Sequence, residues 1–272
     1  MYVNNEKVLR IIHHWPCSGG TLISKCIASL SNIIFLNEVH PYAYIRHMKT
    51  NEKEYLPTDL IQQLSFKKNG ANANICNSAF VGAISEVNDT ISKMNKILVI
   101  RDHSYVDFFR GPLPRKESLI HELFCEKYNL QRIFTVRHPL DSWLSLKENK
   151  WDKGIQFNSF DEFCLRIKLM IKAMKNVPIF YYEKFCMEPD KEMKVISDSL
   201  NLKFNKSFKR KFFGIKLSGD SGRSSSEIKS RPRRKADNEF KNYILKCKNY
   251  IDVCSILKYK VNYNSSFPYL II

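Results

Sequence analysis

Short, continuous runs of apolar residues alternate along the chain with longer segments in which apolar residues recur at helical spacing. Continuous apolar runs are typical of strands that are buried on both faces of a parallel sheet. The alternation predicts a single α/β domain over residues 1–272, with a central, mostly parallel β-sheet flanked by helices. Strands are expected over 8–13, 32–36, 96–100, 131–136 and 177–182. Helices are expected over 22–30, 58–66, 77–94, 116–128, 141–146, 160–175, 190–200 and 237–258.

Polar residues at several expected helix starts are candidate N-caps, because their side chains can accept a hydrogen bond from a backbone amide of the first turn. Asn77 or Ser78 is placed to cap the helix that ends near residue 94. Asp141 and Asp237 are placed to cap the helix after the fourth strand and the last helix. The segment 214–235 is rich in Ser, Gly and Arg, which predicts a loop.

Polar side chains gather at the ends of the expected strands. In open parallel sheets, ligands bind in the crevice at the carboxyl ends of the strands. We therefore expect these residues to line one crevice. They are Ser18, Arg101, Asp102, His103, Arg137 and Glu183.

The first expected strand leads into a loop with the sequence Pro-Cys-Ser-Gly-Gly-Thr over residues 16–21, and a helix follows. Two adjacent glycines let the backbone pass close to a ligand, and the first amides of a helix have no intrahelical partner. Those donors and the positive end of the helix favour an anion such as phosphate. No Lys follows the second glycine, so this is not a Walker loop. A simple tight turn is the alternative interpretation.

A second candidate anion site follows the fourth expected strand. Arg137 stands at the end of that strand, and Ser145 lies eight residues later in the next helix. A guanidinium group is a forked donor suited to phosphate, and a Ser hydroxyl adds one more donor. In the alternative interpretation, Arg137 pairs with a carboxylate and Ser145 is an ordinary small residue of the helix.

The charge of the chain indicates an anionic partner. The 272 residues carry a formal net charge of +17, and twelve Lys or Arg residues within 203–235 stand against two acidic residues. Such a run is typical of proteins that bind nucleic acid, a polyanionic substrate or a phosphate-bearing cofactor, although a solvated basic segment is the plain alternative. The eight cysteines form no CxxC pair and no signal-peptide pattern is present, so we expect reduced thiols, a cytoplasmic location, no bound metal and no membrane partner.

Taken together, the motifs resemble those of the sulfotransferases that use 3′-phosphoadenosine 5′-phosphosulfate (PAPS), which have a P-loop-like α/β architecture. In that family the first strand leads into a loop of the form Pro-Lys/Arg-Ser-Gly-Thr-Thr, which residues 16–21 match in part. Its second motif has Arg, then Pro two residues later and Ser eight residues later. Arg137, Pro139 and Ser145 match that spacing. The resemblance extends from residue 8 to about residue 235.

The resemblance implies a cofactor site. The loop would bind the 5′-phosphosulfate, Arg137 and Ser145 would bind the 3′-phosphate, and a late basic loop within 203–235 would clamp the nucleotide. Residues 182–183 (Tyr-Glu) with Pro189 also fit a family pattern, and residues 231–234 (Arg-Pro-Arg-Arg) follow the clamp. The implied cofactor-binding residues are Cys17, Ser18, Gly19, Gly20, Thr21, Leu22, Arg137, Ser145, Gly222, Arg223 and Ser224.

The resemblance also implies a general base. In the cytosolic members a strand ends in Lys-x-His, and here Arg101, Asp102 and His103 occupy those places. His103 would take the proton of a hydroxyl or an amine on a small-molecule or carbohydrate acceptor, because an unperturbed imidazole titrates at about 6.5. The alternatives are a purely structural His103 and Asp102 as the base.

The charge of the loop departs from the family pattern. Cys17 stands where the family has Lys or Arg, and a thiol supplies no positive charge. Another cation is therefore needed near the leaving group. Lys25, one helical turn after Thr21, is one candidate, and His14 and Arg101 are the others. Lys25 could equally be a surface residue of its helix.

Three other functions stay open at this point. A nucleotide-dependent small-molecule kinase shares the strand-loop-helix logic but lacks the Walker lysine and the carboxylates that hold Mg²⁺. A nucleic-acid-binding protein would use the basic region 203–235, which has no interleaved aromatic platform. An inactive relative would bind the nucleotide and transfer nothing. The acceptor pocket is expected over 41–95 and 104–115, with the aromatic residues Tyr42, Tyr44, Tyr105, Phe108 and Phe109 in it or in the core.

Overall fold

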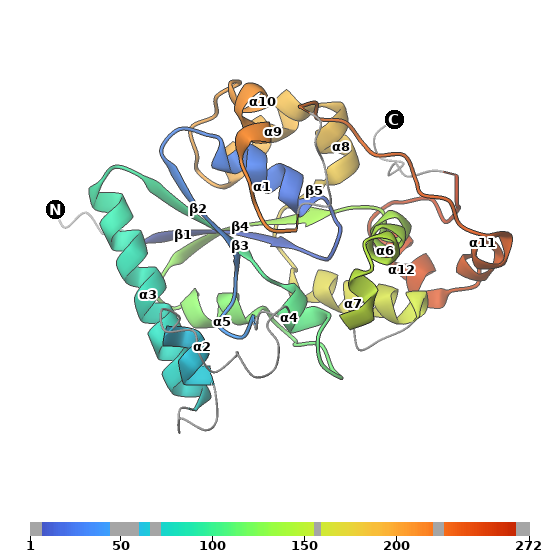
Figure 1. Cartoon of the computed structure of the whole chain (residues 1–272), viewed down its shortest axis with the longest axis horizontal. Helices are drawn as coiled ribbons and strands as arrows, with labels where there is room; N and C mark the ends of the chain where they lie inside the picture. The colour runs from blue at the N-terminus through green and yellow to red at the C-terminus, as the bar shows by residue number, and fades with distance from the viewer. Residues whose placement is uncertain (1–6, 44–59, 66–71, 155–158, 220–225, 265–272) are drawn as a thin grey trace.

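A computed structural model describes residues 7–43, 60–65, 72–154, 159–219 and 226–264. Within these residues, five parallel strands form one sheet in the order β2-β3-β1-β4-β5 (Figure 1). The strands lie at the expected positions, and the parallel sheet confirms the predicted fold class. They are β1 (Val8–His14), β2 (Ile33–Val39), β3 (Ile97–Asp102), β4 (Asn129–Val136) and β5 (Ile179–Tyr181).

The central strand β1 lies between β3 and β4, so the polar residues at the ends of these three strands lie at one edge of the sheet. It pairs with β3 on one side, where Ile12 is opposite Arg101, and with β4 on the other, where His14 is opposite Thr135. Parallel strands all present their carboxyl ends at the same edge of a sheet. The polar residues at the ends of β1, β3 and β4 are therefore neighbours, as the sequence predicts.

Alternate residues of the strands face opposite sides of the sheet, and each side is covered by helices (Figure 1). Ile12, Val99 and Ile133 pack with α1 and with the helices that follow β5. Ile11 and Ile100 pack on the other side with α3 and α5. The helices named here are α1 (Gly20–Ala28), α3 (Ala73–Lys93), α5 (Leu119–Phe124), α8 (Tyr182–Met187), α9 (Pro189–Ser199) and α10 (Phe208–Lys211).

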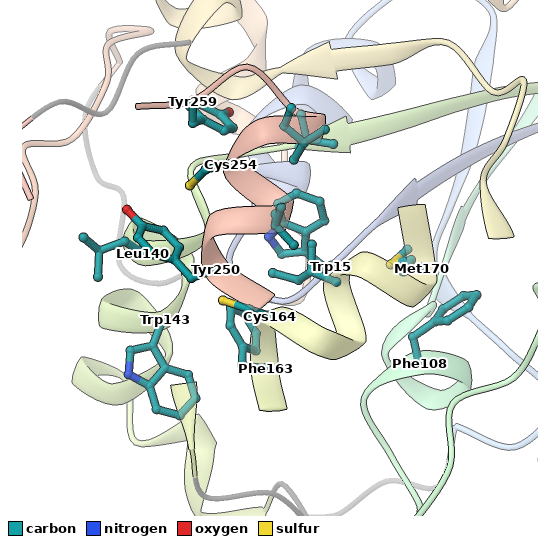
Figure 2. Close-up of a cluster of buried hydrophobic side chains, with 14 of the residues drawn as sticks. Trp15, Phe108, Leu140, Trp143, Phe163, Cys164, Met170, Tyr250, Cys254 and Tyr259 are labelled. Atoms are coloured by element: carbon teal, nitrogen blue, oxygen red, sulfur yellow. The ribbon is translucent and has the colours of Figure 1, made fainter. Parts of the chain in front are cut away.

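A third apolar cluster lies beyond β4 and joins three helices to the start of the loop at residues 16–21 (Figure 2). Trp15 is fully buried in it, and its indole N–H donates to the Ser142 hydroxyl at 3.0 Å. Trp15 is thus a core residue with its polar atom satisfied. The three helices are α6 (Pro139–Glu148), α7 (Phe160–Ala173) and α12 (Lys248–Ile256).

The remaining elements of the described residues are short. They are α2 (Leu60–Ser65), α4 (Tyr105–Phe108), α11 (Asn238–Ile244), η2 (Trp151–Gly154) and η3 (Phe212–Gly214). None of the described helices has the length and apolar character needed to cross a membrane.

Helix boundaries differ from the predicted ones where another residue caps the helix. Helix α3 begins before Asn77, because the Asn72 side chain accepts from the Ile75 amide at 3.1 Å. Helix α6 begins at Pro139 with His138 as its cap, and Asp141 is not the cap. Asp237 caps the last helical region as predicted, but that region is two helices, separated at residues 245–247.

The basic region 203–235 is not a loop throughout. Its first third folds into α10 and η3, because Phe208 and Phe212 bury their rings against α1 and the sheet. Two elements that the apolar pattern does not indicate also flank the strand ends. Helix α4 follows β3, and α8 begins at Tyr182, where the sequence predicts the end of a strand.

Candidate active site

The loop at residues 16–21 turns sharply between β1 and α1. Cys17 has φ 61° and Gly19 has φ 85°, both in the left-handed region. The Ser18 amide donates to the Trp15 carbonyl at 3.2 Å, and the Leu22 amide donates to the Gly19 carbonyl at 3.0 Å. Two of the amides expected to bind an anion are thus used within the turn. The amides at the very start of α1 have no intrahelical partner.

The two glycines of the loop are required by protein contacts. A Cβ on Gly19 would lie 2.2 Å from the Tyr182 ring, and a Cβ on Gly20 would lie 2.9 Å from the His14 side chain. Any larger residue at either place would displace its neighbour. The loop is therefore held against β1 and α8 by close packing, which fixes the direction of its amides.

Arg137 reaches this loop from the end of β4. Its guanidinium group lies 4.7 Å from the centre of the Tyr182 ring, and its Nη1 donates to the Cys17 carbonyl at 3.4 Å. Arg137 is 6% exposed, yet its Nε has no hydrogen-bond partner in the described residues. The Ser18 hydroxyl is likewise buried and unpartnered there. Unpaired buried donors are costly, so this corner of the molecule has donors to offer to a ligand.

Cys17 is surrounded by polar groups of α6. The Ser142 hydroxyl donates to its carbonyl at 3.4 Å, and Ser145 lies close enough to the thiol to influence its pKa. Burial raises the pKa of the Cys17 thiol, while Ser145 and the charges of Arg137 and Arg234 act in the opposite direction. The net shift is upward, so the side chain is a neutral thiol near pH 7 and is not activated as a nucleophile.

Arg101 occupies the other side of β1, and its donors are used by the protein. Nε donates to His14 Nε2 at 2.9 Å, and Nη1 donates to Asn37 Oδ1 at 3.0 Å and to the Ser218 carbonyl at 3.3 Å. Nη2 lies 3.3 Å from a Glu38 carboxylate oxygen. Burial lowers the pKa of Arg101 to about 10, so the group is still a cation at neutral pH.

His14 is a neutral acceptor. Its Nε2 accepts from Arg101, and burial next to that cation holds its pKa well below the usual value. His14 therefore does not supply the positive charge expected near the leaving group. A proton on Nε2 would point at the Arg101 guanidinium, which is itself a cation and a donor. Of the three expected cations, Arg101 keeps its charge at neutral pH.

Residues 218–219, which belong to the basic region 203–235 but not to the implied clamp residues, cross the start of α1. Thr21 donates its hydroxyl hydrogen to the Gly219 carbonyl at 3.2 Å. The Ser218 hydroxyl donates to the Glu38 carboxylate at 2.5 Å. A Cβ on Gly219 would lie 3.1 Å from that carboxylate, and Gly219 has φ 72°. Residues 218–219 are therefore packed tightly between α1, β2 and β3.

Asp102 is held by donors to one of its oxygens, which argues against its alternative role as the base. Its Oδ2 lies 2.8 Å from His13 Nδ1 and accepts from the hydroxyls of Ser104 at 2.8 Å and Ser118 at 3.2 Å. The side chain has no exposed surface. Burial tends to raise the pKa of Asp102, but His13 and the hydroxyls outweigh it and the pKa is lowered. Asp102 is a buried anion that fixes the end of β3.

His103 lies at the rim of the same edge. Its side chain is 26% exposed, and its ring packs against Tyr105 with the ring centres 5.7 Å apart. Burial lowers the pKa of His103, partly offset by Glu38 and Asp102. The imidazole is therefore neutral near pH 7 and able to accept a proton.

Solved structures of known function resemble this fold over almost its full length. The sulfotransferase domain from the curacin biosynthetic pathway is 16% identical, with a TM-score of 0.56, over 93% of this chain and 98% of that domain. The sulfotransferase domain from the Synechococcus PCC 7002 olefin synthase is 15% identical, with a TM-score of 0.52, over 96% and 98%. No protein-family model and no curated protein matches the chain.

The chain has the sulfotransferase fold.

In this sulfotransferase fold, Lys25 is an interior residue of α1 and is 6% exposed. The alternative interpretation of Lys25 as a surface lysine is therefore wrong. Lys25 lies in the interior one helical turn from Thr21, where a lysine is suitable for an anion at the start of the helix.

The fifth strand end carries a buried carboxyl group. Glu183 accepts from the His138 amide at 2.9 Å and from the Tyr259 hydroxyl at 2.8 Å. Burial raises the pKa of Glu183 to about 7, against the opposing effect of these donors and of Arg137. Glu183 thus connects β4, α8 and the C-terminal segment beneath Arg137.

The late basic segment lies against the same corner. The Arg231 amide donates to the Tyr182 hydroxyl at 3.3 Å, and the Arg233 guanidinium forms two bonds to the Asp141 carboxylate, at 2.8 and 3.1 Å. Arg233 is thus a structural partner of α6. Gly222, Arg223 and Ser224, the residues implied as the clamp, lie outside the described residues.

The aromatic residues expected near the acceptor divide into two groups. Phe108 and Phe109 are fully buried core residues. Tyr42 and Tyr105 are partly exposed, and Tyr44 lies outside the described residues. Glu38 is one of the residues beside the candidate site that the sequence analysis missed. The available signal was its position at the end of the second strand, beside the polar ends of the others.

Proposed function

We propose that the protein is a sulfotransferase that uses PAPS and transfers the sulfuryl group to a hydroxyl or an amine of a small-molecule or carbohydrate acceptor. One observation carries the proposal: Tyr182 joins the three expected parts of a nucleotide site. Gly19 packs on its ring, Arg137 stacks over it, and the Arg231 amide donates to its hydroxyl. The glycine loop, the arginine after β4 and the late basic segment therefore belong to one corner.

The residues present fit a nucleotide with separated anionic groups. The buried Arg137 Nε and Ser18 hydroxyl lack partners in the described residues, and Arg137 and Ser145 both influence the pKa of the Cys17 thiol. When bound, PAPS supplies the sulfuryl group and a phosphate leaving group. Arg137, Ser145 and the loop amides would hold it, and Thr21 would add a hydroxyl from the first turn of α1.

On the acceptor side, His103 would take the proton of the acceptor hydroxyl or amine as that oxygen or nitrogen bonds to sulfur. Arg101 supplies a fixed positive charge between His14 and Glu38. Catalysis of this kind depends mainly on positioning and on the stabilisation of developing charge.

The decisive experiment is incubation with sulfur-labelled PAPS and a panel of phenols, aliphatic alcohols, sugars and amines. We expect labelled product with at least one acceptor class. A thermal-shift comparison separates the alternatives: adenosine 3′,5′-bisphosphate should stabilise the protein, and ATP with Mg²⁺ should stabilise it less. A larger shift with ATP and Mg²⁺ would favour a kinase. Salt-sensitive binding to DNA or RNA without any nucleotide effect would favour a nucleic-acid-binding protein.

A further inference from the structure

A β-bulge interrupts the pairing of β2 with β3 just before the candidate site. The strands run in register up to Leu36 opposite Ile100, and the register then shifts so that Val39 is opposite Asp102. Within the shift, Glu38 has φ 54°, a left-handed conformation that residues other than glycine rarely adopt. Bulges of this kind redirect a side chain and are frequent next to active sites. The outlier therefore raises the question of what the Glu38 side chain does.

The bulge aims the Glu38 carboxylate at the ends of two elements. One oxygen lies 3.9 Å from His103 Nδ1, and the other lies 3.3 Å from Arg101 Nη2. Ser218 donates to the oxygen that faces His103, at 2.5 Å. The backbone is tied at the same place, because the His103 amide donates to the Val39 carbonyl at 3.2 Å. Glu38 and His103 are thus held side by side by both backbone and side-chain contacts.

His103 Nδ1 is buried and has no hydrogen-bond partner in the described residues. Arg101 and His40 are already engaged, since Arg101 donates to three neighbours and His40 lies 3.1 Å from Asp107. Asp102 is bonded through Oδ2 to His13 and to two serine hydroxyls, and no contact joins its Oδ1 to a partner in the described residues. Of the described groups that face His103, the Glu38 carboxylate is the acceptor placed to take a proton from Nδ1.

We propose that Glu38 is a positioning residue for His103: its carboxylate accepts the Nδ1 hydrogen and leaves Nε2 as the atom that takes the acceptor proton. A side-chain rotation that shortens the 3.9 Å separation completes this bond. The inference rests on the proposed function, because it assigns the tautomer of the proposed base. The same carboxylate also pairs with the charge of Arg101. Glu38 would therefore orient both the proposed base and the cation on this side of β1.

The first test needs no acceptor. Proton–nitrogen correlation spectra of protein with labelled histidine report the protonated nitrogen and the titration of each imidazole, and the His103→Asn spectrum assigns His103. We expect the hydrogen on Nδ1 in the wild type. Glu38→Gln should lower the pKa of His103, because the carboxylate raises it, and should shift the tautomer toward Nε2–H.

Glu117→Gln is the matched control, because Glu117 forms a comparable pair with His121 at 3.6 Å on helix α5. It should move the titration of His121 and leave His103 unchanged. Should Glu38→Gln fail to fold, Glu38→Asn removes the same charge with a residue that accepts a left-handed conformation more readily. Adenosine 3′,5′-bisphosphate binding by calorimetry checks that each variant is folded.

The second test uses the acceptor that gives the best turnover with labelled PAPS. Glu38→Gln should lower kcat by about 10- to 100-fold, within the contribution of a general base, and move the acidic limb of the kcat/KM profile to lower pH. Glu38→Asp should recover part of the loss. If Glu38 had only a structural role, the acidic limb of the kcat/KM profile would stay at the same pH in Glu38→Gln.

Three results would overturn the inference: an Nε2–H tautomer in the wild type, a His103 titration unmoved in Glu38→Gln, or full activity of that variant. Activity retained in His103→Asn but lost in Glu38→Gln would make Glu38 the base itself and also overturn it. If no acceptor is sulfated and adenosine 3′,5′-bisphosphate does not bind, the proposed function fails. The spectra then still decide whether Glu38 sets the tautomer of His103.

Discussion

Two arginines flank the central strand β1, and their surroundings differ. Arg101, on the β3 side, is 3% exposed, and its donors contact His14, Asn37, Glu38 and the Ser218 carbonyl. Arg137, on the β4 side, is 6% exposed, with one long bond to the Cys17 carbonyl and an Nε that has no partner in the described residues.

The difference indicates two uses of the same side chain. A buried cation without full hydrogen bonding is unfavourable unless a ligand supplies the missing acceptors. The Arg137 side therefore has the features of a binding site that an anion completes. The Arg101 side is already assembled, which suits groups that must keep a fixed direction during a reaction. The predictions below test this division.

The largest effect is expected on the Arg101 side. His103→Asn should lower kcat by about 10²- to 10⁴-fold, because it removes the proposed general base. Binding of adenosine 3′,5′-bisphosphate, measured by calorimetry, should not change, since the proposed nucleotide contacts lie on the Arg137 side. His121→Asn is the control. Unchanged turnover in His103→Asn would remove this residue from the mechanism.

Arg233→Ala should lower the free energy of unfolding by about 3–5 kcal/mol, because it leaves the Asp141 carboxylate buried without its partner. The side chains are 8% and 3% exposed in this pair. Lys229→Ala is the control, since the Lys229–Glu227 pair is fully exposed to water on the same segment. Urea unfolding measures both. Equal stability of the two variants would contradict the structural role of Arg233.

Glu183 should make stability fall as the pH rises from about 4.5 to 7. The folded protein keeps the Glu183 proton up to a pKa of about 7, whereas the unfolded chain loses it near 4.5. The contribution is about 3 kcal/mol. Glu183→Gln should abolish it. Buried histidines act in the opposite direction, such as His138, whose pKa burial lowers to about 3.

The informative quantity for Glu183 is thus the difference between the variant and the wild type, taken from urea unfolding at pH 5 and pH 8. A difference that does not depend on pH would show that Glu183 titrates normally. Arg137 contributes to the environment of this carboxyl, so the same experiment reports on the Arg137 side of the site.

Arg137→Ala should weaken the binding of adenosine 3′,5′-bisphosphate by about 1.5–3 kcal/mol, the size of a hydrogen bond to a charged group. Adenosine 5′-monophosphate, which lacks the 3′-phosphate, should lose less. Arg132→Ala is a matched control on the same strand, with a partly buried guanidinium that lies outside the site. Wild-type affinity in Arg137→Ala would contradict the assignment of this residue to the nucleotide.

The sequence predicts the sheet and the strand-end edge because buried parallel strands are continuous apolar runs. The apolar runs stop at residues such as Ile100 and Val136, at or close to the ends of β3 and β4. Helix starts are less predictable, since several polar residues compete to cap each helix. In α3, Asn72 and not Asn77 accepts the capping hydrogen bond. Asp141 does not cap α6, and its carboxylate binds Arg233 from a distant segment of the chain.

The missed part of the site depends on geometry that no short pattern encodes. Glu38 reaches His103 only because the register of β2 shifts, and Ser218 reaches Glu38 across 180 residues of chain. Cys17 illustrates the opposite case: the departure from the family loop is visible in the sequence, and the structure shows the thiol neutral among Ser145, Arg137 and Arg234.

The Tyr182 ring has a consequence for synthesis of the protein. The ring lies between Gly19, which is synthesised early, and the Arg231 amide, which is synthesised much later. A nascent chain that ends before residue 231 can pair its early strands. It lacks the amide that donates a hydrogen bond to the Tyr182 hydroxyl. Affinity for the proposed nucleotide should therefore appear only after residue 231 has been synthesised and its amide has docked on Tyr182.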